Sequence, residues 1–163
     1  MITVGIDPGS RRIGYGVVRK KGASLSLLHI GTLEIFSQQE EDALVILYDK
    51  LSRLFSRHRP DIVAVEKLYL TKNRKTAIEV AQARGIVLLV AKKAGARIME
   101  YTPTVVKSSF TGDGRCDKKA MRILAEKMFP ERAGEIQSSL DDAVDALALA
   151  VVASLQSSLD SGR

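Results

Sequence analysis

Four carboxylate residues stand at positions where acidic side chains could share one chemical task. Asp7 and Glu66 each end a short apolar run, and Asp142 and Asp145 lie three residues apart in a later apolar stretch. Hard carboxylate oxygens, with no histidine or cysteine among them, favour Mg²⁺ or Mn²⁺ over zinc. Two such ions about 3.5–4 Å apart can activate a water and stabilise the leaving oxygen of a phosphodiester. If the fold brings the four residues together, they predict a metal-dependent phosphodiester hydrolase.

Asp7 lies between an apolar run and a turn sequence. It follows the alternating apolar run over residues 2–6 and precedes Pro8-Gly9. Proline favours extended backbone in the residue before it, and glycine allows the chain to reverse. Residues 13–18 then have the pattern of a returning strand, so Asp7 is expected near the tip of a hairpin. An aspartate before Pro-Gly is by itself most often a plain turn residue.

The acidic residues at 141–145 need separate explanations. Aspartate near a helix start ordinarily serves the cap and the helix dipole, which explains Asp141 as a capping pair with Ser138. Asp145 lies further inward among apolar residues, where a carboxylate costs free energy unless it is paired or binds a cation. Spacings of three and four residues both place side chains on one helical face. Periodicity therefore leaves open whether Asp142 or Asp141 accompanies Asp145.

Apolar periodicity predicts the elements that would position these residues. Strands are expected at residues 2–7, 13–18, 24–36, 61–66 and 96–101, and helices at 40–58, 73–93, 103–110, 118–129 and 140–155. Three consecutive strands followed by strand–helix alternation predict an α/β fold, a five-stranded mixed sheet with helices on both faces. Residues 1–155 are expected to form a single domain, and residues 156–163 a frayed tail with little to bury. The second half of the helix over 73–93 is apolar on most sides, which favours burial against the core and against a second subunit.

Composition narrows the classes of partner. The chain carries 25 Lys and Arg against 19 Asp and Glu, a net charge of +6, which suits a polyanion. The basic clusters at 72–75 and 115–119 flank motifs, whereas pairs such as Arg11-Arg12 are interpreted as solvated surface.

The single cysteine, Cys116, excludes an internal disulfide and cannot form a zinc site by itself. No apolar segment reaches the length of a membrane span and no leader precedes the first strand, so we expect a cytoplasmic protein with no membrane partner.

Four sequence blocks carry a resemblance to a known family. They are Ile6-Asp-Pro-Gly-Ser10 with Gly14-Tyr-Gly16, Val65-Glu-Lys-Leu-Tyr69, Ala81-Gln-Ala-Arg-Gly85 and Asp142-Ala-Val-Asp-Ala-Leu-Ala148. In this order and spacing the chain, from Met1 to about Leu155, resembles the RuvC family of bacterial Holliday junction resolvases. The resemblance implies a ribonuclease H-like fold, a homodimer, and Mg²⁺-dependent nicking of two like-polarity strands of a four-way DNA junction in recombination and repair.

The resemblance also assigns roles to residues. It implies metal ligands at Asp7, Glu66, Asp142 and Asp145, which decides between Asp141 and Asp142, and two Mg²⁺ per subunit with Mn²⁺ as a substitute. It implies that Tyr69 stacks at the opened crossover and that Lys107 and Lys118 lie near the scissile phosphate. Further DNA contacts are expected from Lys72, Arg74, Lys75 and Arg115. Lys67 departs from the glutamine common in the family, and a branch-migration helicase complex of the RuvA and RuvB type is an implied partner.

Two other classes of protein share parts of this pattern. ATP-binding proteins of the actin and sugar-kinase superfamily also follow a first strand with an Asp-x-Gly turn. They need a second phosphate loop and a much longer, two-lobed chain than 163 residues. A non-catalytic junction-binding protein, or another ribonuclease H-like relative, is the remaining alternative. The presence of all four carboxylates argues against an inactive protein.

Overall fold

The sheet begins with an antiparallel meander of β1 (Ile2–Pro8), β2 (Arg12–Lys21) and β3 (Ser24–Glu34). Two strands then join it in parallel, β4 (Ile62–Glu66) beside β1 and β5 (Arg97–Tyr101) beside β4. The computed structural model describes residues 1–37, 39–67 and 74–160. Within them the strand order is β3-β2-β1-β4-β5, which confirms the expected five-stranded mixed sheet.

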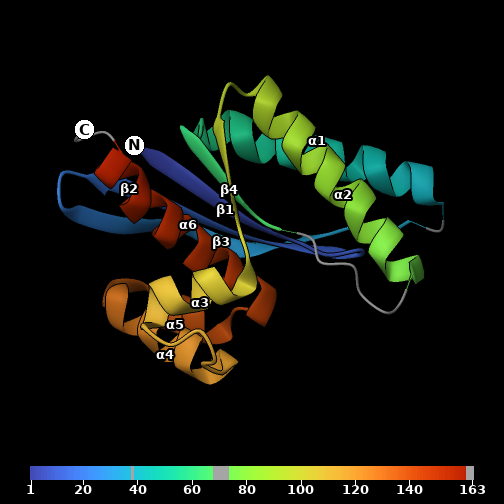
Figure 1. The fold of residues 1–163 in the computed structure, drawn as a ribbon. Coiled ribbons are helices and arrows are strands. Elements are labelled where there is room, and N and C mark those ends of the chain that lie inside the picture. The colour runs from blue at the N-terminus through green and yellow to red at the C-terminus, as the bar shows by residue number, and fades with distance from the viewer. Residues whose placement is uncertain (38, 68–73, 161–163) are drawn as a thin grey trace.

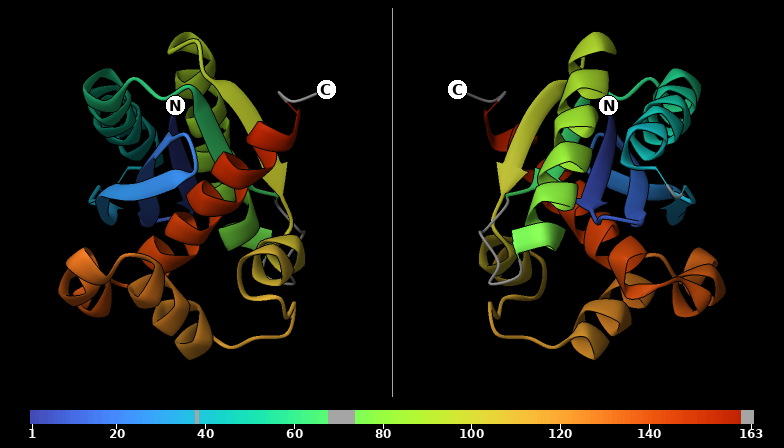
Figure 2. Two further views of the ribbon diagram at one scale, coloured as in Figure 1. Left: turned by 90° about the vertical axis from the view of Figure 1, so that its left-hand side faces the viewer. Right: turned by 90° about the vertical axis from the view of Figure 1, so that its right-hand side faces the viewer.

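Helices cover both faces of this sheet, as predicted (Figures 1 and 2). On one face lie α1 (Glu40–His58) and α2 (Arg74–Lys93). Across the other runs α6 (Asp141–Asp160), which packs on β1 and β2. Four shorter elements gather near the N-terminal end of α6: α3 (Pro103–Thr111), α4 (Lys118–Met128), the 3-10 helix η1 (Pro130–Arg132) and α5 (Ala133–Ser138).

The core is divided by the sheet into two apolar layers. In β4, Val63 and Val65 pack into the layer beneath α1 and α2, while Ile62 and Ala64 pack into the layer beneath α6. Side chains alternate between the faces of a strand, so a central strand covered on both sides must be apolar throughout. Glu66, the last residue of β4, ends this run and is only partly buried.

Glycines on two strands allow α6 to lie directly against the sheet. A Cβ atom at Gly5 would come within 1.9 Å of the Ala146 carbonyl oxygen, and one at Gly14 within 2.0 Å of the Asp142 carbonyl oxygen. Only a residue without a side chain permits such an approach between backbones. The two glycines therefore fix the height of α6 above β1 and β2, and with it the position of the Asp142 backbone.

The C-terminal region differs from expectation. Residues 156–160, expected to belong to a frayed tail, continue α6, and Ser157 is only 4% exposed. The Ser157 hydroxyl donates to the Ser154 carbonyl and lies against Met1, so this turn of the helix does pack on the rest of the chain. Residues 161–163 lie outside the described part. None of the helices described is both long and apolar enough to cross a lipid bilayer.

Candidate metal centre and nucleic-acid interface

Three elements converge on one edge of the sheet. Asp7 is next to last in β1 and Glu66 is last in β4, and because Ile6 pairs with Val65 in parallel register, both carboxylates leave the same edge. Asp7 also pairs across the hairpin with Gly14, the residue in contact with the Asp142 backbone. The first turns of α6 therefore place Asp142 and Asp145 over the ends of β1 and β4. We call these four residues the carboxylate centre.

The carboxylates of this centre act on one another electrostatically. Burial, followed by the charges of Glu66, Asp145 and Asp142, raises the pKa of Asp7 from 3.8 to about 7. Burial and then the Asp145 charge raise the pKa of Glu66, and burial likewise raises that of Asp145 against the opposing charge of Lys118. Each shift reflects a cost of holding negative charge in a poorly solvated place beside other negative charges. Such a donor set suits a hard divalent cation, whose charge would offset both costs.

The side chains as placed do not form a closed cage. Among residues 1–37, 39–67 and 74–160, no three histidine, cysteine, aspartate or glutamate side chains are close enough together to ligate one ion. The four carboxylates nevertheless act on one another electrostatically, and Asp142 is at the same time engaged by Arg12.

Basic side chains face the carboxylate centre from three elements. Arg12 Nε, at the start of β2, donates to Asp142 Oδ2 at 2.7 Å. Lys107, on α3, opposes the raised pKa of Glu66, and its Nζ donates to the Cys116 carbonyl at 3.0 Å. Lys118, the first residue of α4, opposes the raised pKa of Asp7. The two lysines predicted from the sequence thus lie beside the acids, and their contact with DNA stays a prediction.

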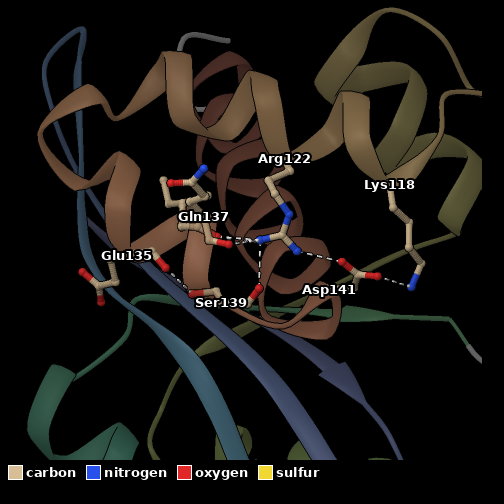
Figure 3. Close-up of polar contacts among 7 residues, drawn as sticks. Lys118, Arg122, Glu135, Gln137, Ser139 and Asp141 are labelled. Carbon is tan, nitrogen blue, oxygen red and sulfur yellow. Dashed lines mark hydrogen bonds and ion pairs between the residues drawn. The ribbon is translucent and has the colours of Figure 1, made fainter.

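Asp141 has a different set of partners from the one expected. Ser138 does not cap α6 with it, because the Ser138 hydroxyl donates to the carbonyls of Gly134 and Glu135 within α5. Asp141 instead accepts from Arg122 Nη2 at 2.7 Å and pairs with Lys118 Nζ at 3.3 Å (Figure 3). The Arg122 guanidinium, and after it Lys118, hold the pKa of Asp141 below its usual range. The capping prediction is wrong because Ser138 belongs to a short helix that the sequence pattern did not reveal.

The structure gives less information on the other residues predicted to contact DNA. Arg115 lies exposed in the loop before α4, where its backbone N–H donates to Asp113 Oδ1 at 2.8 Å. Tyr69 and Lys72 lie outside the described residues. Arg74 and Lys75 belong to the first turn of α2, and the description does not include their side chains.

Two arginines were not singled out by sequence reasoning. Arg12 follows Arg11 in a pair that is typical of surface charge, and Arg122 sits in α4 without any motif. Their partners lie 130 and 19 residues away along the chain. Each arginine stands on an element that packs beside the aspartates of α6. The sequence alone does not reveal this packing, so it offered no signal for either residue.

Comparisons with known proteins show which family this chain is similar to. The family model described as crossover junction endodeoxyribonuclease RuvC matches residues 3–153. A relative of that name from Ruminiclostridium cellulolyticum is 39% identical over 152 residues, 93% of this chain and 90% of its own length. One from Petrotoga mobilis is 42% identical over 154 residues, 92% and 91% of the two chains. These matches confirm the resemblance carried by the four sequence blocks.

Solved structures give the same result for the fold. Thermus thermophilus RuvC in complex with a Holliday junction substrate superposes with a TM-score of 0.87 at 28% identity, covering 98% of this chain and 96% of that one. The fowlpox virus Holliday junction resolvase superposes with a TM-score of 0.65 at 17% identity, covering 98% and 99%. The second likeness concerns the fold alone.

Proposed function

Because this chain belongs to the RuvC family of crossover junction endodeoxyribonucleases, we propose that it resolves four-way DNA junctions by nicking two strands of like polarity. The observation that carries the proposal is the carboxylate centre. Four acidic residues from two parallel strand ends and one helix act on one another there, with lysines alongside. An acidic centre with a basic border suits a phosphate backbone that approaches together with divalent cations.

Asp7, Glu66, Asp142 and Asp145 would hold the cations, which we propose to be two Mg²⁺ per subunit, with Mn²⁺ able to replace them. When bound, these ions supply Lewis acidity and lower the pKa of a ligated water. The chain would contribute the backbone positions of the four oxygen donors. Asp7 and Glu66 are fixed by the strand ladder, and the α6 donors by the contact of the Asp142 backbone with Gly14.

The basic residues would bind and orient the DNA backbone. Lys107 and Lys118 both reach the carboxylate centre electrostatically, so a phosphate placed there would contact ammonium groups from α3 and α4. Arg12 is paired with Asp142. With Asp142 engaged as a metal ligand, the Arg12 guanidinium would be available to a phosphate.

We propose a homodimer joined through α2. Ile78 and Leu89 lie about three turns apart on this helix and are 60% and 50% exposed. Exposed apolar side chains on one side of a helix are typical of a protein interface. Two like-polarity strands also require two active sites at a fixed separation, which a two-fold dimer supplies.

A branch-migration helicase complex of the RuvA and RuvB type remains the expected partner, by resemblance alone.

The test separates cutting from binding. A four-way junction and a linear duplex of the same sequence are incubated with Mg²⁺, and junction affinity is measured by competition in EDTA. We expect the parent to cut the junction only. Asp145→Asn should bind it within about threefold of the parent yet cut at least about 10³-fold more slowly, since cation placement acts on the transition state. Equal cutting of the duplex, or parent-like cutting by Asp145→Asn, would contradict the proposal.

A further inference from the structure

Asp141 lies beside the carboxylate centre but has both of its oxygens engaged by cations. Oδ1 accepts from Arg122 Nη2 at 2.7 Å and Oδ2 faces Lys118 Nζ at 3.3 Å. Both partners come from α4, one turn apart (Figure 3). We call Lys118, Arg122 and Asp141 the Asp141 cluster. With its oxygens occupied in this way, Asp141 is not a free donor for a metal ion, so its role must be sought in what it holds.

Arg122 is the fixed member of the cluster. Its Nη1 donates to three carbonyls near the end of α5, those of Ile136 at 2.6 Å, Gln137 at 3.3 Å and Ser139 at 2.8 Å. These carbonyls lie at the C-terminal end of α5, where backbone donors run out; the Ser139 N–H reaches the Ile136 carbonyl, and Arg122 supplies a further donor to all three. The Arg122 side chain is only 21% exposed, and its planar fork is satisfied on both nitrogens. It therefore holds Asp141 in one orientation.

Lys118 is the member whose position depends on the others. Its side chain is 60% exposed and carries a flexible four-carbon stem, which would sample many rotamers without a partner. Burial alone would lower the Lys118 pKa, but the hydrogen bond to Asp141 and the surrounding carboxylates raise it. Lys118 is also close enough to Asp7 and Asp145 to act on both. The ammonium thus pairs with Asp141, and its charge acts on the carboxylate centre.

The cluster borders an open cavity of about 310 Å³ that adjoins the centre. Its lining includes Arg12, Lys118, Arg122, Asp141 and Asp142. A phosphate entering this cavity would meet the Lys118 ammonium only if that side chain stays where Asp141 holds it.

We infer that Asp141 and Arg122 are positioning residues for strand cleavage, because they hold the Lys118 ammonium at the edge of the carboxylate centre where the phosphate is cut. The inference rests on the proposed function, since it gives Lys118 a task in that reaction. A misplaced charged group can slow a reaction although nothing in the reacting geometry itself is removed. A purely structural tie among α4, α5 and α6 is the competing account, and it predicts no dependence on Lys118.

A double-mutant cycle distinguishes the two accounts. Single-turnover junction cleavage and junction Kd are measured for the parent, Asp141→Asn, Lys118→Met and the double variant, with Glu131→Gln as a charge-matched control in the exposed 3-10 helix. Asp141→Asn should slow cleavage about tenfold with Kd within about twofold, and Lys118→Met should slow it at least as much. In the Lys118→Met background, Asp141→Asn should then have no further effect, and Asp141→Glu should recover part of the single-variant loss.

A second measurement follows Lys118 without an assay of cutting. Amine-modifying reagent is added to the metal-free protein, and the rates at Lys118 and Lys119 are compared by mass spectrometry. Asp141→Asn should raise the Lys118 rate severalfold and leave Lys119 unchanged. Three results would each overturn the inference without affecting the proposed nuclease function. They are an unchanged modification rate at Lys118, parent-like cleavage by Asp141→Asn or by Lys118→Met, and an equal loss of cleavage on Asp141→Asn in both backgrounds. A parent that cuts no junction would overturn the proposed function and this inference together.

Discussion

At Asp7 the requirements of stability conflict most clearly with those of the proposed metal site. The strand that carries it is apolar and buried, and its neighbours are acidic, so its carboxylate is costly to ionise in the folded protein. A site with this arrangement is disfavoured for folding alone. Groups with such perturbed pKa values, gathered at the edge of a sheet, are typical of functional sites.

Asp7→Asn should stabilise the metal-free protein at neutral and higher pH while abolishing cleavage. The pKa of Asp7 is 3.8 in a free side chain and raised to about 7 in the fold. Protonated Asp7 therefore contributes its full share to the unfolding free energy below pH 3.8, and this contribution is lost as the pH rises to about 7. At pH 8 the variant should gain on the order of 2 kcal/mol in unfolding free energy, a figure reduced for solvent screening. Denaturant melts at pH 5 and pH 8 would show the gain shrinking at the lower pH.

Mg²⁺ supplies the control for this prediction. The ion should stabilise the parent at pH 8 and have much less effect on Asp7→Asn, since binding to the native state alone raises stability. A variant that melts like the parent at both pH values, with and without Mg²⁺, would show that Asp7 is not a strained ligand.

Arg12→Met should alter the dependence on metal more than the chemistry. Arg12 neutralises Asp142 at 2.7 Å, so it competes with a cation for that oxygen. Removing it should lower the Mg²⁺ concentration for half-maximal cleavage by about two- to fivefold and weaken junction binding slightly. A Mg²⁺ titration of cleavage, with Arg11→Met as the neighbouring control, checks this. An increased Mg²⁺ requirement would mean that Arg12 supports the site instead of competing in it.

The residues of the site were predictable from sequence to different degrees. Glu66 ends an apolar run and Asp145 lies within one, so both stand out from pattern. Asp7, an ordinary turn residue when taken alone, stands out only beside the other carboxylates, and the family motif adds Asp142. Arg12 and Arg122 have no such signature. A long basic side chain suits almost any surface, and its partner is decided only when β2, α4 and α6 have packed together.

At the scale of elements, α6 and the strands beneath it form the unit that matters most for the site. The Gly14 Cβ position would lie 2.0 Å from the Asp142 carbonyl oxygen, against backbone that cannot rotate away. Gly14→Ala should therefore lift the first turn of α6, with a loss of about 2–4 kcal/mol in unfolding free energy.

Cleavage should fall in Gly14→Ala even at temperatures where the fold is intact, because the Asp142 backbone moves with that turn. Gly134→Ala is the matched control, since a Cβ atom there meets nothing within 4 Å and the residue lies in helix α5. It should be neutral or slightly stabilising. Thermal melts and cleavage rates of both variants decide the matter, and equal behaviour of the two would contradict the close packing of α6.

Most elements were predictable because their signals are local. The sequence of α1 repeats apolar residues on one face, Asp117 caps α4 by accepting from the Ala120 N–H, and Gly95 supplies the positive φ that ends α2. Helix α5 and η1 were missed because neither is long enough to show a period. Helix α6 extends beyond its predicted end because Ser157, polar by type, packs against Met1 at the far end of the sheet.

At the scale of the whole molecule, the proposed homodimer would be joined through α2. Leu89→Lys should convert a dimer into a monomer, because it places a charge on the exposed apolar side of this helix. Sedimentation at micromolar concentration compares it with the parent, and Val45→Lys, at an exposed site on α1, serves as control. The monomeric variant should lose paired nicking. A parent that sediments as a monomer while cutting junctions would rule out this assembly.

Strand-resolved mapping of nicks on a synthetic four-way junction is the most direct test of the account as a whole. Each of the four strands is labelled in turn, and the junction is incubated with Mg²⁺ or with EDTA, using the parent and Asp145→Asn. With the carboxylate centre present twice in the proposed two-fold assembly, the account predicts nicks at symmetric positions in two strands of like polarity, dependent on Mg²⁺ and absent in the variant. Nicks spread over all four strands, nicks that persist in EDTA, or nicks made equally by Asp145→Asn would contradict it.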